Sequence, residues 1–348
     1  MDSEVGSRSE IRKIQLTGGS TYIVSLPKKW VTQHGLKARD ELRIEWRPSG
    51  SLRLNAETTS IRKRRRVDIS LDEIGSDFLL DHLIGAYLCG AERIRVTSTK
   101  TIQRSEKRKF RRFIQTTRGI EITDETDHMV EMVTLLNTSE IPLYSSINRM
   151  YLLVSSQIRD VSEVLLGGDK SLLTDSEDRE KEIDALRLLL ERQVGQILES
   201  ASIETSLGIN RWEASELSNI VKIFERIGDH CYLLSNLCFE HKIPDSISPE
   251  KIPANAIPAW LKSVKSLIGN LKKRKIKEIQ NSKADIQKAV EKLSDFESGL
   301  WNSKLTAKDA LFLDKFSESM RRILAYTLDM AEVLINIRTH RDSREENF

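Results

Sequence analysis

The sequence of 348 residues predicts a mainly α-helical protein with a small β-rich head at its N-terminus. From about residue 141 onward, apolar residues recur every three or four positions, which is the spacing of amphipathic helices. Before residue 67, short runs rich in Ile, Val, Tyr and Leu are separated by Gly and Pro, as in small β-domains. The segment between them mixes both patterns, which predicts a small α/β module.

The head is expected to contain short strands and one short helix. The strands are predicted over 11–16, 21–26 and 41–54, with breaks at Gly18-Gly19, Gly35 and Pro48-Ser49-Gly50. Pro27 suits the first turn of a helix and Gly35 suits the end of one, so a short helix should lie between the second and third strands.

The head is also strongly basic. Through Arg66 the chain has 15 Lys and Arg residues against 7 Asp and Glu residues, a net charge of +8, whereas the whole chain carries only +3. This asymmetry predicts that the head binds a polyanion. The basic run from Arg62 to Arg66 can be read either as a phosphate contact or as a solvated linker, and a nuclear-localisation signal is the weaker reading.

The middle segment predicts strand, helix, strand, helix and two further strands. The strands are expected over 67–71, 92–96, 120–123 and 129–136, and the helices over 77–89 and about 102–117. The glycines lie at the ends of these elements rather than in a phosphate-binding loop after a strand, so no chemistry is recognisable here. We expect a spacer or dimer support, whose basic second helix could add phosphate contacts.

Long helices are predicted in the rest of the chain, over 141–167, 176–200, 209–242, 255–279, 282–302 and 306–340. Their apolar seams follow a near-seven repeat, which is typical of helical bundles. A shift of about 96 residues lays Phe224 on Met320 and Ile227 on Ile323 with the seams in register. This match favours a duplicated three-helix unit, although coiled-coil periodicity alone could mimic it.

The composition disfavours several classes of protein. No apolar run approaches the ~18 residues that span a bilayer, and the N-terminus lacks the hydrophobic stretch of a secretory signal. We therefore expect a cytoplasmic protein that is peripheral to a membrane at most.

Cys89, Cys231 and Cys238 form no CxxC pair and are interpreted as small apolar residues. Nucleophile-elbow, HExxH and Walker motifs are absent, so we do not expect an enzyme.

Two pairs of carboxylates are candidate metal ligands. Glu180 and Asp184 are four residues apart on one predicted helix, and Glu225 and Asp229 are four residues apart on another. Residues at this spacing share a helical face, so two neighbouring antiparallel helices would bring four negative charges together. A hard divalent or ferric cation would offset their repulsion. The alternative is that both pairs lie on ordinary solvated faces.

Two nearby residues bear on this hypothesis. Gly228 lies in the middle of a predicted helix, where Gly costs about 1 kcal/mol relative to Ala. Its presence predicts close approach by another helix or by the shell of an ion. His230 could be a fifth ligand, but a lone His beside an apolar seam is more often a polar residue with its hydrogen bonds satisfied.

The run from Phe224 to His230, FERIGDH, closely resembles the third-helix signature of PhoU proteins. The predicted helix that carries Glu180 and Asp184 resembles the second helix of those proteins. The resemblance covers about 141–340 and implies a tandem pair of three-helix bundles. It also implies a multinuclear metal cluster, with iron, zinc, manganese or magnesium as the metal. The implied ligands are Glu180, Asp184, Glu225 and Asp229.

The second half of this region departs from the PhoU pattern. Arg321 and Ala325 stand at the positions that match Glu225 and Asp229. Its second helix has Glu291 and Asp295 four residues apart, but their register relative to the last helix does not match. We therefore expect metal only in the first three-helix unit.

The head resembles the SpoVT/AbrB domain, a swapped-hairpin β-barrel. Residues 22–46, YIVSLPKKWVTQHGLKARDELRIEW, have the family order of strand, Pro, short helix, Gly-Leu and an Asp before the last strand. The resemblance implies an interlocked homodimer whose basic residues contact DNA. The arginine pair that some members place after the Pro is replaced here by Val31 and Thr32. The DNA-binding candidates are Arg12, Lys13, Lys28, Lys29 and Arg39.

The two resemblances together imply domains at 1–66, 67–138, 139–245 and 246–342, a fusion that looks like an archaeal arrangement of PhoU-type regulators. They imply a metal-binding transcriptional regulator that restrains phosphate uptake and serves phosphate homeostasis. Two alternatives stay open. In one, the head only dimerises and the partner is a phosphate transporter or its ATPase. In the other, the carboxylates form a metal-dependent phosphohydrolase site.

Overall fold

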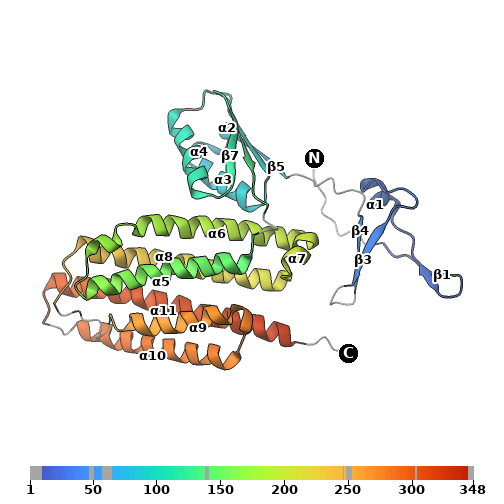
Figure 1. Cartoon of the computed structure of the whole chain (residues 1–348). Coiled ribbons are helices and arrows are strands. Elements are labelled where there is room, and N and C mark those ends of the chain that lie inside the picture. Colours follow the sequence, from blue (N-terminus) through green and yellow to red (C-terminus); the bar gives the residue numbers. More distant parts are fainter. Residues whose placement is uncertain are drawn as a thin grey trace. The chain divides into compact units, whose positions relative to one another are not determined.

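The computed structural model describes residues 10–46, 51–56, 65–137, 141–245, 247, 253–301 and 304–343. The chain divides into two compact units (Figure 1). One contains the head, Met1–Arg64, and the other spans Arg65–Arg344. No helix within the described ranges is long and apolar enough to cross a membrane.

The head contains β1 (Gln15–Thr17), β2 (Thr21–Ile23), α1 (Lys28–Gln33), β3 (Leu42–Trp46) and β4 (Leu52–Ala56). β1 pairs with β2 and β3 pairs with β4, both antiparallel. The stretch predicted over 41–54, with its break at Pro48, Ser49 and Gly50, contains the two strands β3 and β4, and the break itself lies outside the described residues. The short helix is confirmed: it follows Pro27, and Gly35 adopts a left-handed φ of 64° after it.

Within one chain, none of the described side chains of the head is buried. Its large apolar residues are exposed, including Ile11, Leu16, Tyr22 and Ile44 at 100%, 58%, 74% and 56%. Apolar side chains normally leave water when a domain folds, so these residues form an exposed apolar surface of the kind that marks an interaction site.

The middle module contains β5 (Arg66–Ser70), α2 (Leu71–Ile74), α3 (Leu79–Leu88), β6 (Arg93–Thr97), α4 (Arg104–Thr116), β7 (Ile120–Glu125) and β8 (Met129–Thr134). The strands form one sheet in the order β5-β6-β8-β7, in which only β5 and β6 are parallel. Phe110 and Phe113 of α4 and Leu83 of α3 are buried in one cluster with Ile94 and Met132 of the sheet. The predicted order of elements is confirmed, apart from the short α2.

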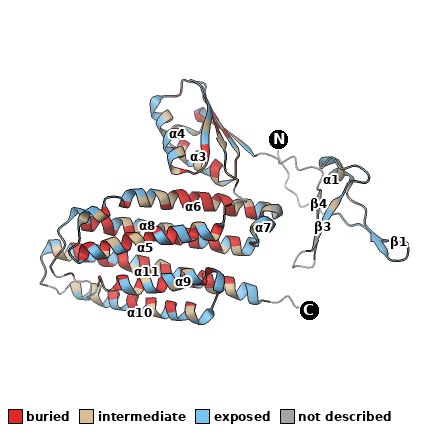
Figure 2. Cartoon of the chain, in the orientation of Figure 1, coloured by how far each residue is buried: buried red, intermediate tan, exposed pale blue. Residues whose placement is uncertain are grey.

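The helical region contains α5 (Leu143–Leu165), η2 (Lys170–Leu173), α6 (Ser176–Glu199), α7 (Ala201–Leu207), α8 (Arg211–Glu240), α9 (Ala256–Lys273), α10 (Ile276–Leu300) and α11 (Ala307–Asp342). The helices α5, α6 and α8 pack as one three-helix bundle and α9, α10 and α11 as a second, with α8 against α11 between them. Figure 2 shows that buried residues line the inner faces of these helices.

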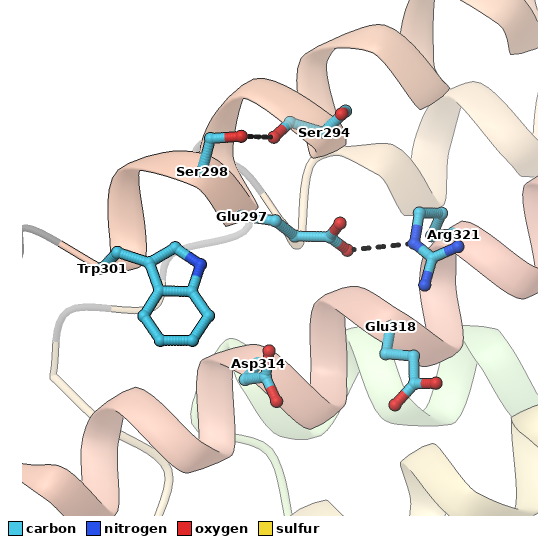
Figure 3. A pocket seen from close by; sticks show the side chains of 7 residues that line it. All are labelled: Ser294, Glu297, Ser298, Trp301, Asp314, Glu318 and Arg321. Atoms are coloured by element: carbon cyan, nitrogen blue, oxygen red, sulfur yellow. Dashed lines mark hydrogen bonds and ion pairs between the residues drawn. The ribbon is translucent and has the colours of Figure 1, made fainter.

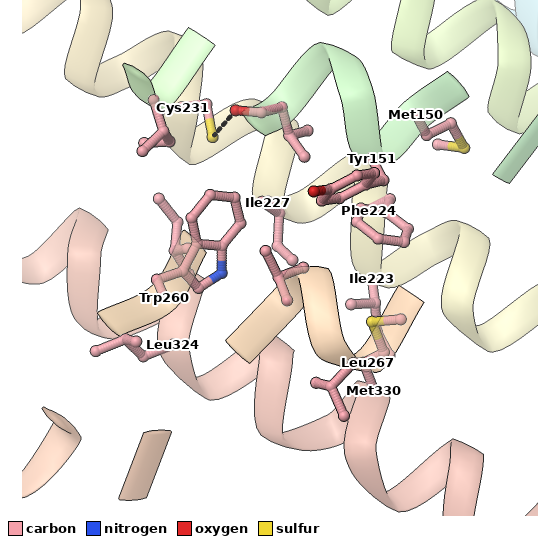
Figure 4. Packing of buried hydrophobic residues seen from close by; sticks show 14 of the residues in the cluster. Met150, Tyr151, Ile223, Phe224, Ile227, Cys231, Trp260, Leu267, Leu324 and Met330 are labelled. Carbon is pink, nitrogen blue, oxygen red and sulfur yellow. Dashed lines mark hydrogen bonds between the residues drawn. The ribbon is translucent and has the colours of Figure 1, made fainter. Parts of the chain in front are cut away.

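One hydrophobic core runs through both bundles. The predicted seam residues of α5, α8 and α11 are all buried. Figure 4 shows Phe224 and Ile227 of α8 among side chains from the second bundle, such as Trp260 and Met330. Thr327, a polar member of the α11 seam, accepts a 2.8 Å hydrogen bond from Nε1 of Trp260. This bond accounts for its hydroxyl in an otherwise apolar layer.

The boundary between α9 and α10 differs from the predicted one. The sequence suggested a break near residue 280, but α9 ends at Lys273 and is followed by Arg274, which adopts a left-handed φ of 53°. The side chain of Asn270 accepts the Lys275 N–H at 2.9 Å and stabilises the turn. The Arg274 guanidinium is buried and contacts Tyr144 and Glu213. A turn made by Asn and Arg lacks the Gly or Pro by which sequence patterns locate helix ends.

A buried arginine joins the middle module to the helical region. Arg192 of α6 is 1% exposed and donates to the backbone oxygens of Tyr87 at 2.5 Å and Ala91 at 2.9 Å. Its guanidinium also lies 4.9 Å from the centre of the Tyr87 ring. The Tyr87 oxygen lies in the last turn of α3, where a positive charge is favourable, and the Ala91 oxygen lies just beyond the helix.

We expect Arg192→Met to loosen the middle module. The change leaves two buried carbonyl oxygens without their donors, at a cost of about 2–4 kcal/mol. Hydrogen exchange of α3 and β6 amides should therefore become faster. Arg159→Met, at an exposed arginine of α5, should change exchange little. Equal exchange rates of these amides in the two variants would show that Arg192 does not hold the middle module against the helical region.

Candidate metal centre

The four predicted metal ligands lie on two helices that pack along each other. Glu180 and Asp184 are on α6, and Glu225 and Asp229 are on α8. Asp229 is exposed and the other three are partly buried. The i, i+4 spacing therefore places each pair on the rim of the α6–α8 seam.

The carboxylates influence one another across the seam. Burial raises the pKa of all four groups above its ordinary value. The charges of Asp184 and Asp229 raise the pKa of Glu180 further, and Asp184 does the same to Glu225 and Asp229. The structure thus brings the two pairs into one patch of mutually repelling charge.

Sequence reasoning missed a cation in this patch. Nε of Arg187 lies 3.4 Å from Oε1 of Glu225, and its Nη1 lies 3.2 Å from Oε2 of Glu191. The guanidinium lowers the pKa of Asp184, Glu225 and Asp229, opposing the effect of burial. Its position three residues after Asp184, on the same helical face, was the signal that could have revealed it.

The donor set suits a hard cation, because every candidate ligand is a carboxylate oxygen. In the described part of the chain, however, no three Asp, Glu, His or Cys side chains are arranged so that they could hold a metal ion. Arg187 supplies part of the positive charge that the patch requires. The site is therefore a patch of two carboxylate pairs beside Arg187, while the charges of Lys181 and Arg226 also lower the pKa of Glu180 and of Glu225 respectively.

Gly228 permits close contact between the two helices. A Cβ at this position would lie 3.0 Å from Cδ1 and 3.3 Å from Cγ2 of Ile183 on α6. Ile183 is buried directly beside Asp184. Of the two expectations for this glycine, the structure shows the close approach of a helix.

His230 lies against the second bundle. Its ring is 6.0 Å from that of Tyr326 on α11, and its pKa is lowered mainly by burial and further by the charge of Arg322. Its Nδ1 is buried without a hydrogen-bond partner in the described residues. These neighbours place the ring at the α8–α11 contact rather than beside the α6 carboxylates.

The second bundle has an ion pair at the matching place, but the positive and negative residues are exchanged between the two helices. Nε of Arg321, on α11, lies 3.3 Å from Oε1 of Glu297, on α10. Figure 3 shows this pair beside an open pocket of about 370 Å³, whose lining includes Ser294. Because Arg321 matches Glu225, Glu297 matches Arg187.

This pairing fixes which residues of α10 correspond to the first carboxylate pair. With Glu297 laid on Arg187, the buried Leu293 falls on the buried Ile183. Ser294 then stands at the position of Asp184. Val290 stands at that of Glu180. The second bundle thus lacks the acidic set, whereas Glu291 and Asp295 are exposed on another part of α10.

The predicted DNA-contacting side chains are all exposed. Lys28 and Lys29 lie in the first turn of α1, and Arg39 has a left-handed φ of 80° in the turn before β3. The Asp40 carboxylate accepts the Lys37 N–H at 2.7 Å and closes that turn. The remaining candidates, Arg12 and Lys13, precede β1, and Arg12 pairs with Glu10.

The pH dependence of stability should reveal the carboxylate patch. A carboxyl group whose pKa is raised by folding destabilises the protein as pH rises from its unfolded pKa, 3.8 for Asp, through the raised value. In metal-free protein, Asp184→Asn should increase the free energy of unfolding at pH 7 and so raise the unfolding midpoint. The increase should be ~1 kcal/mol or less, because solvent screens the patch. The gain should vanish at pH 3. Asp178→Asn, at an exposed position of α6, is the control, and a lower midpoint for Asp184→Asn at pH 7 would contradict the assignment.

Comparisons with known proteins match both ends of the chain. Residues 147–237 match the model of the PhoU domain, and residues 15–66 match the model of MazE, a bacterial antitoxin described as the antidote in toxin recognition. The comparison with curated proteins gave no match.

Two solved structures are similar to part of the chain. They are the phosphate transport system regulatory protein PhoU from Streptococcus pneumoniae, with TM-score 0.45 and 15% identity over 58% of this chain and 96% of that one, and PhoU from Pseudomonas aeruginosa, with TM-score 0.43 and 14% identity over 57% and 96%. The matched region 147–237 contains both carboxylate pairs. The chain thus combines an N-terminal domain of the MazE type with a PhoU domain.

Proposed function

We propose that this protein is a homodimeric, DNA-binding regulator of phosphate uptake whose helical region binds a metal ion. The observation that carries the proposal is the presence of a MazE-type head and a PhoU domain in one chain. Mapping the genomic DNA that the protein occupies in phosphate-rich and phosphate-poor cells tests it. Occupancy near phosphate-uptake genes should change with phosphate, and occupancy that is the same in both conditions contradicts the regulatory role.

The surface of the head supports dimerisation. Its described residues form two separate hairpins with no buried side chain, and both β1 and β3 expose apolar residues. Interlocking two copies would bury these side chains against each other, which is the arrangement of a swapped-hairpin dimer. Hydrophobic burial, at about 25 cal/mol per Å², is then the driving force for association.

The charge of the head supports DNA as the ligand. The excess of basic residues through Arg66 lies on a chain that is otherwise slightly acidic. Phosphate contacts by Lys and Arg supply affinity without sequence preference, and that affinity falls steeply with salt. In the middle module, four exposed arginines of α4 provide a second basic surface: Arg104, Arg108, Arg111 and Arg112.

We expect Lys28→Ala/Lys29→Ala to weaken binding to all DNA sequences. Each lost phosphate contact should reduce the slope of log affinity against log salt by about 1. Lys272→Ala/Lys273→Ala removes the same charge from the last turn of α9 and is the matched control. Electrophoretic mobility shifts at several salt concentrations measure both variants. A wild-type dimer that shifts no DNA at low salt would favour the alternative of a head that only dimerises.

Metal binding by the carboxylate patch is proposed on the basis of its charge. The four carboxylates at the α6–α8 seam keep raised pKa values although Arg187, Lys181 and Arg226 act on them, so added positive charge would stabilise their ionised forms. A divalent or ferric ion would stabilise the native state through mass action, because the unfolded chain does not assemble the patch. Glu180, Asp184, Glu225 and Asp229 would hold this ion.

We expect Glu225→Gln/Asp229→Asn to abolish bound metal. Glu291→Gln/Asp295→Asn removes the same charge from exposed positions of α10 and should leave metal content unchanged. Elemental analysis of the purified proteins, together with the rise in unfolding temperature on adding Mn²⁺ or Mg²⁺, measures the difference. Metal retained in the first variant, or lost in the second, would refute the assignment.

A further inference from the structure

The first strand of the middle module leaves one edge unpaired. In the sheet order β5-β6-β8-β7, β5 pairs with β6 on one side and with no described strand on the other. An edge strand presents backbone N–H and C=O groups that can pair with another strand. The two edges of this sheet differ in how well they are protected against such pairing.

The opposite edge, β7, is poorly suited to pairing. Its register with β8 shifts between Ile122 and Asp124, which is a bulge or similar irregularity. It also carries the acidic residues Glu121, Asp124 and Glu125. Two copies of β7 would bring like charges together, and irregularity and charge both protect an edge. β5 is regular along its whole pairing with β6, from Arg66 to Ser70.

The β5 edge lies beside an open hollow. The hollow has a volume of about 560 Å³ and is lined by β5, α2 and α3, including Val67, Ile69 and Ile74. On its α3 side the hollow is lined by the small residues Gly85 and Ala86, and a Cβ on Gly85 would meet nothing within 4 Å. A strand added to β5 would therefore leave room for its own helix to pack beside α3.

The charges on β5 are complementary to those of a second β5. Arg66 and Asp68 lie on the same face of the strand and form a hydrogen-bonded ion pair, with Nη2 and Oδ1 2.6 Å apart. In an antiparallel pair centred on Val67, Arg66 of each copy stands opposite Asp68 of the other. Opposite charges directly across a strand pair are stabilising. A register centred on Asp68 would instead place two carboxylates opposite each other.

We propose that two copies of this protein pair through the first three residues of β5, Arg66–Asp68, antiparallel and centred on Val67, to form one sheet that continues across both chains. The pairing extends the dimer proposed for the head, so it rests on that proposed function. The partner is a second copy because the Arg66–Asp68 pattern matches itself under a two-fold axis. The α3 helices of the two copies pack across the hollow at the axis.

Disulfide cross-linking of the full chain tests this register. In a Cys89→Ser background, Cys231 and Cys238 are buried and unavailable. Val67→Cys then places a thiol opposite its own copy, at a separation that a disulfide can bridge. Ser70→Cys, on the same strand, is the matched control because its two copies would lie about 20 Å apart along the strands. Mild oxidation should cross-link Val67→Cys at least about tenfold faster than Ser70→Cys.

Charge reversal separates strand pairing from proximity caused by the head. Adding Asp68→Arg to Val67→Cys should slow cross-linking, because two like charges then face each other on each side of the axis. The further change Arg66→Asp reverses the whole pattern and should restore it. Cross-linking that is equally fast at Val67→Cys and Ser70→Cys, or insensitive to Asp68→Arg, overturns the proposal.

The mass of the untreated protein in solution distinguishes the two dimer contacts. A dimer that fails to cross-link through Val67→Cys leaves the head dimer intact and shows that β5 is free or binds a different partner. A monomer excludes both contacts. Thr123→Cys on the β7 edge should not cross-link in any of these backgrounds, because like charges flank that position.

Discussion

The packing of α8 against α11 is the contact on which the helical region depends. These helices occupy equivalent places in the two bundles, and their buried seams meet in one core. A cation from each helix lies near or acts on an aromatic ring of the other at the edge of this seam. Arg226 of α8 lies 5.6 Å from the ring of Tyr326, and the charge of Arg322 of α11 acts on His230. Each bundle would expose its apolar seam if the other were absent, so the two are expected to unfold together.

This shared core leaves the outer faces of the two bundles free to differ. The α6–α8 and α10–α11 seams each carry an ion pair at the same level, but with exchanged signs, Arg187 with Glu225 and Glu297 with Arg321. In the first bundle the pair is surrounded by further carboxylates. In the second it stands beside Ser294 and Ala325. Ion pairs at a partly exposed surface contribute little to stability, so either polarity is compatible with the same fold.

Most of the fold could be predicted from sequence because it depends on periodicity. The seams of α5, α8 and α11 are long and regular, and a spacing of three and four specifies the buried face whatever the neighbouring helix is. The order of strands and helices in the middle module followed from similarly clear patterns. The break at Arg274 did not, because it depends on the hydrogen bond that Asn270 accepts from the Lys275 N–H and on contacts of Arg274 with Tyr144 and Glu213, far away in sequence.

The candidate site shows the same limit. Spacing alone placed Glu180 with Asp184 and Glu225 with Asp229, since i, i+4 pairs are local. That the two pairs influence each other across the seam, and that Arg187 reaches Glu225, depends on how α6 and α8 are aligned. The close contact at Gly228 helps to set that alignment, and no local pattern reveals which side chain of α6 it admits.

The buried guanidinium of Arg192 has a mechanical consequence. It lies on the same unbroken helix as Asp184, eight residues further along, which corresponds to about 12 Å, or a little over two turns. A helical segment this short behaves as a rigid rod, so axial rotation or sliding at one end is delivered almost undiminished to the other. Further along the same helix, Glu199 forms an ion pair with Arg65, the residue at which the second unit begins. A displacement of α6 at the carboxylate seam would therefore also displace its contacts with Arg65 and with the end of α3.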